Sequence, residues 1–172
     1  EIAQCLVGSE MCIRDRPVVL DADGINALAG HMDEWERRRG RVTVLTPHEG
    51  EFLRVGGDLS QGRTAAAEDF ARRSGAVVVL KGPGTVVAGP DGRCRVNTTG
   101  NCGMAKGGSG DVLSGVVLAL LGLGMDAFDA CCCAVWLHGR AGDLAAQEKG
   151  QWGMTPTDLL ERLPQALREV TE

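Results

Sequence analysis

The sequence predicts an α/β fold in which an open, mostly parallel sheet is flanked by helices. Two observations carry this prediction. Short runs rich in valine and leucine alternate along the chain with longer helical segments, which is typical of strand–helix units. One run, residues 76–81, consists largely of valines and a leucine, the composition of a strand that is covered on both faces. The 172 residues, 44% of them hydrophobic, correspond to one globular domain.

The first half of the chain contains two such units. Residues 17–21 form a predicted strand that leads into a helix starting at Asp23. Residues 42–46 form the next strand. Pro47 suits the first position of a short helix, which we expect to stop at the glycines 56 and 57.

The next segments complete the predicted sheet. Ser60 is expected to cap a helix that runs to residue 74, before the buried strand 76–81. Residues 85–88 and 93–97 flank a Gly-Pro-Asp-Gly turn and therefore predict a β-hairpin.

The last part of the chain is predicted to be helical. Helices are expected over residues 112–123, 127–148 and 156–170. Asp126 is a candidate cap of the second helix, Thr155 is a candidate cap of the third, and Pro156 suits the third helix's first position.

The most distinctive stretch is residues 97–115, N-T-T-G-N-C-G-M-A-K-G-G-S-G-D-V-L-S-G, which precedes an apolar helix. Its six glycines leave backbone N–H groups accessible at a helix N-terminus, where an anion such as phosphate is favoured. The spacing matches neither the dinucleotide fingerprint nor the P-loop. Asp111, which follows this loop, has two readings from chemistry alone: an acid that stabilises the first turn of its helix, or a carboxylate at the mouth of an anion site.

Composition excludes several classes of function. The net charge of −5 argues against a nucleic-acid partner, and the basic run 37–41 is read as a solvated helix end. The longest apolar stretch, residues 112–123, is too short to span a bilayer, so no membrane partner is expected. Seven cysteines without a C-x-x-C pair favour small buried residues in a reducing environment, which predicts a cytoplasmic protein.

Residues 97–115 resemble the signature of the ADP-dependent NAD(P)H-hydrate dehydratases, a branch of the ribokinase-like superfamily. Four more segments resemble this family in the same order: V-V-L-D-A-D-G-I-N at 18–26, L-T-P-H-E-G-E at 45–51, L-K-G-P-G-T at 80–85 and W-L-H-G-R-A-G-D at 136–143. The resemblance covers residues 17–172 and implies a ribokinase-like sheet.

The beginning of the chain departs from the family pattern. Residues 1–16 are similar to translated sequencing adapter, which predicts a non-native segment. Residues 17–172 are then expected to be the carboxyl-terminal part of a single domain whose sheet lacks its amino-terminal strand or strands.

The resemblance also implies the site residues. Asp111 is the expected general base and, with His48, contacts the substrate. The implied nucleotide-binding residues are Lys81, Gly82, Pro83, Gly84, Thr85 and Gly110.

Other residues near these motifs have weaker predictions. Glu49 and Glu51 are first-turn acids or water-mediated Mg²⁺ contacts. Lys106 is a secondary candidate for phosphate binding, and Cys102 is read as a small filler residue. His31 and His138 are read as structural.

The implied reaction is ADP-dependent dehydration of hydrated NADH or NADPH, through phosphorylation of the 6-hydroxyl group and elimination. ADP would be the co-substrate and Mg²⁺ would bridge its phosphates, with no residue assigned as a metal ligand. Two alternatives stay open: a ribokinase-like kinase of a small alcohol or vitamin precursor, and a nucleotide-binding module without catalysis. The resemblance is also compatible with a homo-oligomer and with a fused epimerase domain upstream.

Overall fold

The computed structural model describes residues 16–31 and 37–171, so the predicted non-native segment lies, apart from Arg16, outside the described residues. The strands are β1 (Val18–Leu20), β2 (Thr43–Leu45), β3 (Val77–Leu80), β4 (Val86–Ala88) and β5 (Cys94–Val96). The helices are α2 (Asp23–Asn26), α4 (Glu49–Arg54), α5 (Arg63–Ser74), α6 (Ser109–Gly122), α7 (Ala127–Gly153) and α8 (Pro156–Thr171), with a 3₁₀ turn η1 (Cys102–Met104).

The five strands form one open sheet in the order β1-β2-β3-β4-β5. The first three strands are parallel, whereas β4 and β5 form the predicted antiparallel hairpin. Leu80 at the end of β3 is paired with Val86, and Val86 is paired with Val96 at the end of β5. The segments that follow β1, β2, β3 and β5 therefore leave the sheet on the same side, at the carboxyl ends of the parallel strands. Open α/β sheets bind ligands at these strand ends.

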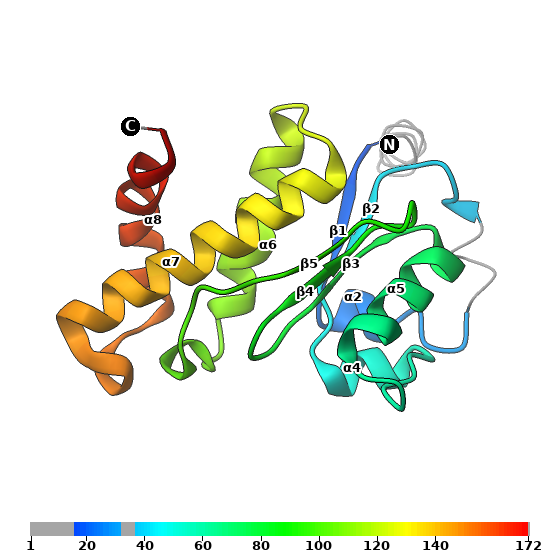
Figure 1. Ribbon diagram of the computed structural model, residues 1–172, viewed down its shortest axis with the longest axis horizontal. Coiled ribbons are helices and arrows are strands. Elements are labelled where there is room, and N and C mark those ends of the chain that lie inside the picture. Colours follow the sequence, from blue (N-terminus) through cyan, green and yellow to red (C-terminus); the bar gives the residue numbers. More distant parts are fainter. Residues whose placement is uncertain (1–15, 32–36, 172) are drawn as a thin grey trace, which may run out of the picture.

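Helices cover both faces of the sheet, as the sequence predicts, with α2, α4 and α5 on one side and α6 and α7 on the other (Figure 1). All four residues of β3 are buried. Because successive side chains of a strand point to opposite faces, Val78 and Leu80 pack with α4 and α5, whereas Val77 and Val79 pack with α6 and α7.

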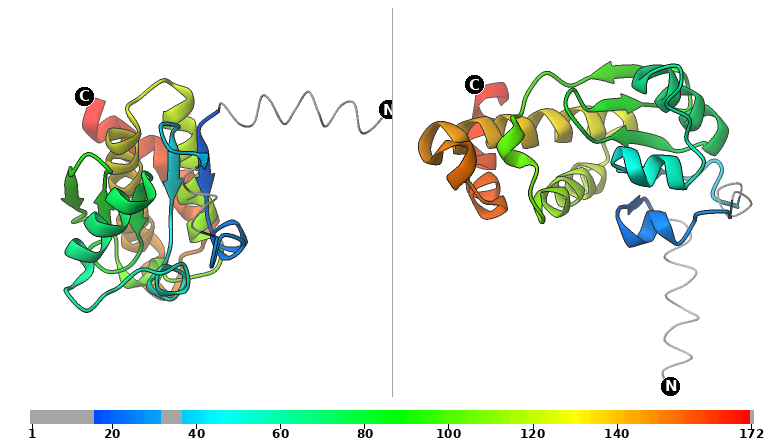
Figure 2. Two further views of the ribbon diagram at one scale, coloured as in Figure 1. Left: turned by 90° about the vertical axis from the view of Figure 1, so that its right-hand side faces the viewer. Right: turned by 90° about the horizontal axis from the view of Figure 1, so that it is seen from below.

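The carboxyl-terminal helices extend the fold beyond the sheet (Figure 2). Helix α7 packs against α8 through Leu137, Ala141, Leu144 and Ala166. No helix within residues 16–31 and 37–171 is long and apolar enough to cross a membrane.

In the first half of the chain, two of the predicted helix starts are wrong. Helix α4 begins at Glu49 rather than Pro47, because His48 is its N-cap and the carbonyl of Pro47 accepts a hydrogen bond from Lys81. Helix α5 begins at Arg63 after Gly62, because the amide and hydroxyl of Ser60 are both bound to Asp58.

Two later helices are longer than predicted. Helix α6 begins at Ser109, three residues early, because Gly108 takes a left-handed conformation (φ 95°) from which the helix can start directly. Helix α7 continues to Gly153, with a break at Gly150 (φ 70°). Its predicted cap is confirmed, since Asp126 accepts hydrogen bonds from the amides of Phe128 and Asp129.

The cysteines are less uniformly buried than predicted. None of the five in the described part of the chain is in a disulfide. Cys131 is fully buried and its burial raises the pKa of the thiol, but Cys102 and Cys133 are exposed.

Candidate functional site

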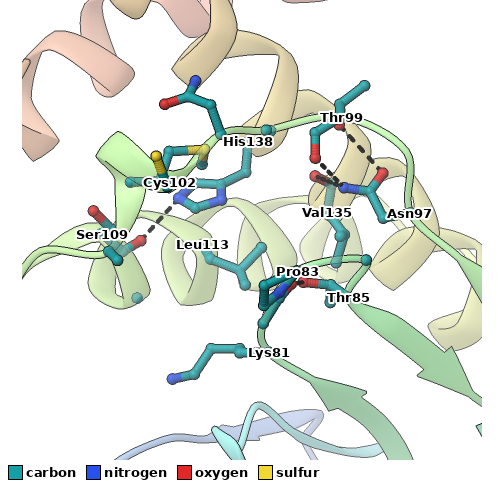
Figure 3. Close-up of a pocket in the computed structure, with 18 of the residues that line it drawn as sticks. Lys81, Pro83, Thr85, Asn97, Thr99, Cys102, Ser109, Leu113, Val135 and His138 are labelled. Carbon is teal, nitrogen blue, oxygen red and sulfur yellow. Dashed lines mark hydrogen bonds between the residues drawn. The ribbon is translucent and has the colours of Figure 1, made fainter. Parts of the chain in front are cut away.

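A cavity of about 740 Å³ lies at the edge of the sheet where the parallel strands end. Figure 3 shows that the loop after β3, the glycine-rich loop and helices α6 and α7 surround it. Seven of the eight predicted site residues line this cavity: His48, Lys81, Gly82, Pro83, Gly84, Thr85 and Gly110. The structure thus brings together residues of three motifs that are far apart in the sequence, at 45–51, 80–85 and 97–115.

The loop after β3 forms one wall of the cavity. Two of its glycines have positive φ angles, 145° at Gly82 and 61° at Gly84, which side chains rarely permit. The hydroxyl of Thr85 donates to the carbonyl of Gly82 at 3.0 Å and closes the loop. The start of the loop is tied to the neighbouring strand, because the amide of Lys81 donates to the carbonyl of Pro47 at 2.8 Å.

The Lys81 side chain extends toward the side of the cavity on which Ser109 lies (Figure 3). Its Nζ is 2.6 Å from Oδ1 of Asp21, which directly follows β1. Burial tends to raise the pKa of the Asp21 carboxyl, but the hydrogen bond and the charge from Lys81 outweigh it and hold this pKa below its usual value. The pair therefore places a cation and a carboxylate together beneath the start of α6, where Ser114 also contacts Asp21 at 3.4 Å.

His48 is the N-cap of α4 and also lines the cavity. Its Nδ1 accepts hydrogen bonds from the amides of Gly50 (3.0 Å) and Glu51 (3.3 Å), while Oε2 of Glu51 accepts from the amide of His48 at 2.9 Å. This reciprocal capping box fixes the ring. Because Nδ1 is an acceptor, the neutral ring carries its proton on Nε2.

Glu49 and Glu51 are placed as first-turn acids of α4. Glu51 is buried within the capping box, and Glu49 forms an ion pair with Arg63. Within the described ranges there is no group of three or more acidic, histidine or cysteine side chains placed to hold a metal ion.

The glycine-rich loop forms the opposite wall and is anchored on α7. Oδ2 of Asp143 accepts from the amide of Gly100 and Oδ1 accepts from the side chain of Asn101, both at 2.9 Å. The hydroxyl of Thr99 donates to a carbonyl of α7 at 2.9 Å. A Cβ atom at Gly139 would lie only 2.3 Å from Thr99, so the loop packs directly on the backbone of α7. The segment 136–143 therefore supports the glycine-rich loop from α7.

The first turn of α6 lies at the cavity and carries hydrogen-bond donors that have no partner in the described part of the chain. The hydroxyl of Ser109 is buried and has no hydrogen-bond partner among the described residues. Within the same part of the structure, the amides of Gly110 and Asp111, in the first turn of α6, make no hydrogen bond with another backbone group. The positive end of a 14-residue helix and a free hydroxyl together fit an anionic group.

His138 of α7 holds this helix start in place. Its Nε2 donates to the carbonyl of Ser109 at 2.9 Å (Figure 3). Burial lowers the pKa of His138 to about 4, so the ring is neutral at pH 7, and the carbonyl acceptor requires the proton on Nε2. The structural reading of His138 agrees with this contact, although the residue also lines the cavity.

Asp111 is the predicted residue that the cavity does not include. It is exposed, and it occupies the first turn of α6 next to Gly110, which does line the cavity. Asp111 is therefore next in sequence to a lining residue without being part of the lining, and both readings of Asp111 stay open.

The two secondary loop residues have partners on α7. Lys106 Nζ donates to the carbonyls of Gln151 (3.3 Å), Trp152 (2.9 Å) and Met154 (2.5 Å), so its ammonium neutralises the carboxyl-terminal end of α7. Cys102 donates to the side chain of Gln151 at 2.9 Å.

Sequence reasoning missed the roles of Asp21, Arg63 and Ser109 at this site. Asp21 lies at the carboxyl end of a predicted strand, and this position is a signal for a ligand site in open α/β sheets. Nothing local marks Arg63, because its contacts are with a loop about twenty residues away.

Comparison with known proteins gives a consistent result. The sequence model of a family described as NAD(P)H-hydrate dehydratase matches residues 5–165. The bifunctional NAD(P)H-hydrate repair enzyme Nnr of Thermofilum pendens is 46% identical over 162 residues, which are 92% of this chain and 31% of that protein. The ADP-dependent (S)-NAD(P)H-hydrate dehydratase of Bacillus subtilis is 41% identical over 154 residues, covering 87% of this chain and 54% of that protein.

Solved structures agree with these sequence matches. The crystal structure of the ADP/ATP-dependent NAD(P)H-hydrate dehydratase from Bacillus subtilis, co-crystallised with ATP and Mg²⁺, superposes with a TM-score of 0.79 at 38% identity and covers 90% of this chain and 55% of that one. A ribokinase-like superfamily protein from Enterococcus faecalis has a TM-score of 0.75 at 26% identity, over 89% of this chain and 52% of that one. The chain spans from about a third to about half of the length of these relatives.

Proposed function

Because the chain belongs to the NAD(P)H-hydrate dehydratase family, we propose that the protein uses ADP to dehydrate hydrated NADH or NADPH. The family match covers residues 5–165, which include every predicted site residue. The name of the Bacillus subtilis relative, which specifies an ADP-dependent dehydratase of NAD(P)H hydrate, supports both the substrate and the nucleotide.

The observation that carries the proposal is the single cavity shared by two motifs. His48, the proposed substrate contact, and the loop from Lys81 to Thr85, the proposed nucleotide contact, line the same space. They are neighbours because β2 and β3 are parallel and end together, with a bridge between His48 and Lys81. A site that transfers a phosphoryl group needs its two reactants side by side, and the closeness of these two segments supports the proposal.

The cavity contains groups that fit ADP. Lys81 offers a cation, and the start of α6 offers backbone amides together with the unpartnered hydroxyl of Ser109. Gly110 packs closely on the Asp21–Lys81 pair, because a Cβ atom there would lie 3.2 Å from Asp21 and 3.4 Å from Lys81. In this proposal Lys81 and the residues 107–110 stabilise the charge on the transferring phosphoryl group.

Mg²⁺ fits as an ion held largely by the phosphates of the nucleotide. Such ions commonly use only one or two carboxylates of the protein, which is compatible with the lack of a larger ligand cluster among the described residues. The crystal of the Bacillus subtilis enzyme grown with ATP and Mg²⁺ supports this requirement. When bound, the ion would neutralise charge on the phosphates.

Asp111 is proposed to accept the proton of the 6-hydroxyl group as that oxygen attacks the β-phosphorus of ADP. The bond between the β-phosphorus and the bridging oxygen breaks, and AMP leaves. The resulting phosphate ester then loses inorganic phosphate together with a ring proton, and the carbon–carbon double bond of the reduced nicotinamide is restored. His48 would contact the nicotinamide side of the substrate from the wall of the cavity. Its Nε2 lies 3.3 Å from Oε1 of Glu51, so this carboxylate orients the nitrogen that carries the proton.

The test uses the purified protein that carries this chain. It is mixed with hydrated NADPH, Mg²⁺ and ADP, and the return of the absorbance of reduced nicotinamide is followed. ADP-dependent recovery with formation of AMP and phosphate is the expected result. A stable phosphorylated product would instead identify a kinase, and ADP binding without any turnover would identify a nucleotide-binding module.

Three further proposals concern the protein as a whole. The bifunctional names of several relatives support a second fused domain, for which the family resemblance implies an epimerase and which the gene sequence would reveal. Self-association is proposed for the folded protein, and its solution mass would test it. A cytoplasmic location is proposed from the unpaired cysteines and is testable by fractionation.

A further inference from the structure

The Arg63 side chain holds the loop that carries the proposed nucleotide contacts. Arg63 is the first residue of α5, which packs on the sheet beside β3 and β4. Its guanidinium lies against the backbone of this loop and donates hydrogen bonds to four carbonyl groups. Nη2 donates to Leu80 and Lys81, both at 3.0 Å, and Nη1 donates to Pro83 and to Gly84 at 3.2 Å.

The loop has no room for a side chain where it passes the guanidinium. A Cβ atom at Gly82 would lie 2.7 Å from Nη2 of Arg63, and the φ angle of this glycine is 145°. The carbonyl groups on both sides of Gly82 are therefore turned toward one cation. Gly82 is thus required by the contact with Arg63 as well as by its own backbone conformation.

The same guanidinium reaches the other half of the site. Its Nε lies 3.1 Å from Oε1 of Glu49, an ion pair without hydrogen-bond alignment. Glu49 directly follows His48 in the first turn of α4. One side chain therefore links the turn that presents His48 to the loop that begins at Lys81.

Only arginine can make this set of contacts. Its planar fork has five N–H donors, enough for four carbonyls and a carboxylate, whereas a lysine ammonium has three donors at one point. The loop contains two glycines with positive φ angles, so its backbone has many alternative conformations without a tether. Holding such a loop in its binding conformation before the ligand arrives raises affinity.

We propose that Arg63 is a positioning residue, which fixes the loop 81–85 in its nucleotide-receptive conformation and sets its distance from His48. Arg63 does not itself line the cavity. The inference rests on the proposed nucleotide site, because its effect is expressed through the affinity for ADP.

The experiment measures ADP affinity by titration calorimetry in the presence of Mg²⁺. Arg63→Lys keeps the charge and the stem but not the fork, and Arg63→Gln removes the charge. We expect both variants to raise the Kd for ADP by about 10- to 100-fold, since small misplacements of a binding group have effects of this size. Arg72→Gln is the matched control on the same helix: Arg72 is 62% exposed and lies 4.0 Å from Asp69, so its Kd should change by less than about twofold.

Kinetics separate positioning from a general loss of structure. In the Arg63 variants the KM for ADP should rise much more than the KM for the hydrated cofactor. Arg63→Lys should recover little of the loss, because a point charge cannot engage four carbonyls.

Each outcome decides the proposal. Normal ADP binding by the parent protein and by both Arg63 variants would overturn this inference alone. Absence of ADP binding by the parent would overturn the nucleotide site itself and this inference with it. If neither Arg63 variant folds while Arg72→Gln does, the arginine is needed for folding and the positioning role is rejected. Full recovery in Arg63→Lys would likewise reject the role of the guanidinium fork.

Discussion

Lys81 and Asp21, which are separated by 60 positions in the sequence, form an ion pair of 2.6 Å at the carboxyl ends of β3 and β1. Both side chains are mostly buried, with exposures of 23% and 16%. The pair lies beside Gly110, so the cation proposed for phosphate binding is held in place by a carboxylate before any ligand binds. This relationship leads to the first of four predictions.

The ion pair should be visible as an energetic coupling. Asp21→Asn and Lys81→Met should each lower the free energy of unfolding by about 1–3 kcal/mol, and the double variant should lose less than their sum, because either single change leaves a half-buried charge unpaired. Urea unfolding of the four proteins measures the coupling.

The free energy of unfolding should also depend on pH through Asp21, which gives a second test of the ion pair. The pKa of folded Asp21 lies below the usual value of 3.8, so its contribution is present above that pH and is lost as the pH falls through the folded pKa. Strict additivity of the two changes at pH 7 would contradict the coupling.

Asp111 should matter for turnover far more than for stability. Asp111→Asn should lower turnover by about 10²- to 10⁴-fold while ADP still binds, the usual range for a positioned acid–base group. Asp129→Asn is the matched control, since Asp129 is also an exposed first-turn acid but belongs to α7. If the two variants retain similar turnover, Asp111 serves only its helix, where it is worth about 0.3–1 kcal/mol.

His138 should make stability depend on pH in a defined window. Its folded pKa of about 4 lies below the ordinary 6.5, so the unfolded chain binds the proton more readily and stability is lost as the pH falls from 6.5 toward 4. The loss is on the order of 3 kcal/mol at the lower end of this window.

His138→Gln supplies the comparison, because its amide can still donate to the carbonyl of Ser109 but does not titrate. The variant should therefore show a shallower fall in the free energy of unfolding between pH 6.5 and pH 4. Parallel curves for the two proteins would show that His138 is not buried in its neutral form.

We expect Lys106 to contribute to stability rather than to ADP binding, although it lines the cavity. Lys106→Met should lower the free energy of unfolding by about 1–3 kcal/mol, because three carbonyls at the end of α7 lose their cation. The Kd for ADP should change by less than about threefold, whereas Lys81→Met should raise it by about tenfold or more. A large loss of ADP affinity in Lys106→Met at unchanged stability would restore the phosphate-binding role that the sequence left open.

Local chemistry makes much of this site predictable from the amino-acid sequence. The glycines before Ser109 predict an exposed helix start, and the valine-rich run before Lys81 predicts a strand buried on both faces, because conformational freedom and burial are properties of short segments. The parallel strands then place His48 and Lys81 at one edge. Helix starts are less secure: Pro47 and Ser60 suit helix starts by residue type, but His48 and Gly62 are the caps.

Tertiary structure alone decided which partner each charged side chain has. Lys106, adjacent to the glycines of the anion loop, is turned toward the end of α7, whereas Lys81 is turned toward Asp21 across the sheet. Arg63 contacts the loop after β3 only because α5 packs on that side of the sheet. The sequence determined the elements and the kind of site they form, since these depend on neighbours along the chain. The pairing of charges depends on which elements become neighbours in space, and that follows from the packing of the two faces of the sheet.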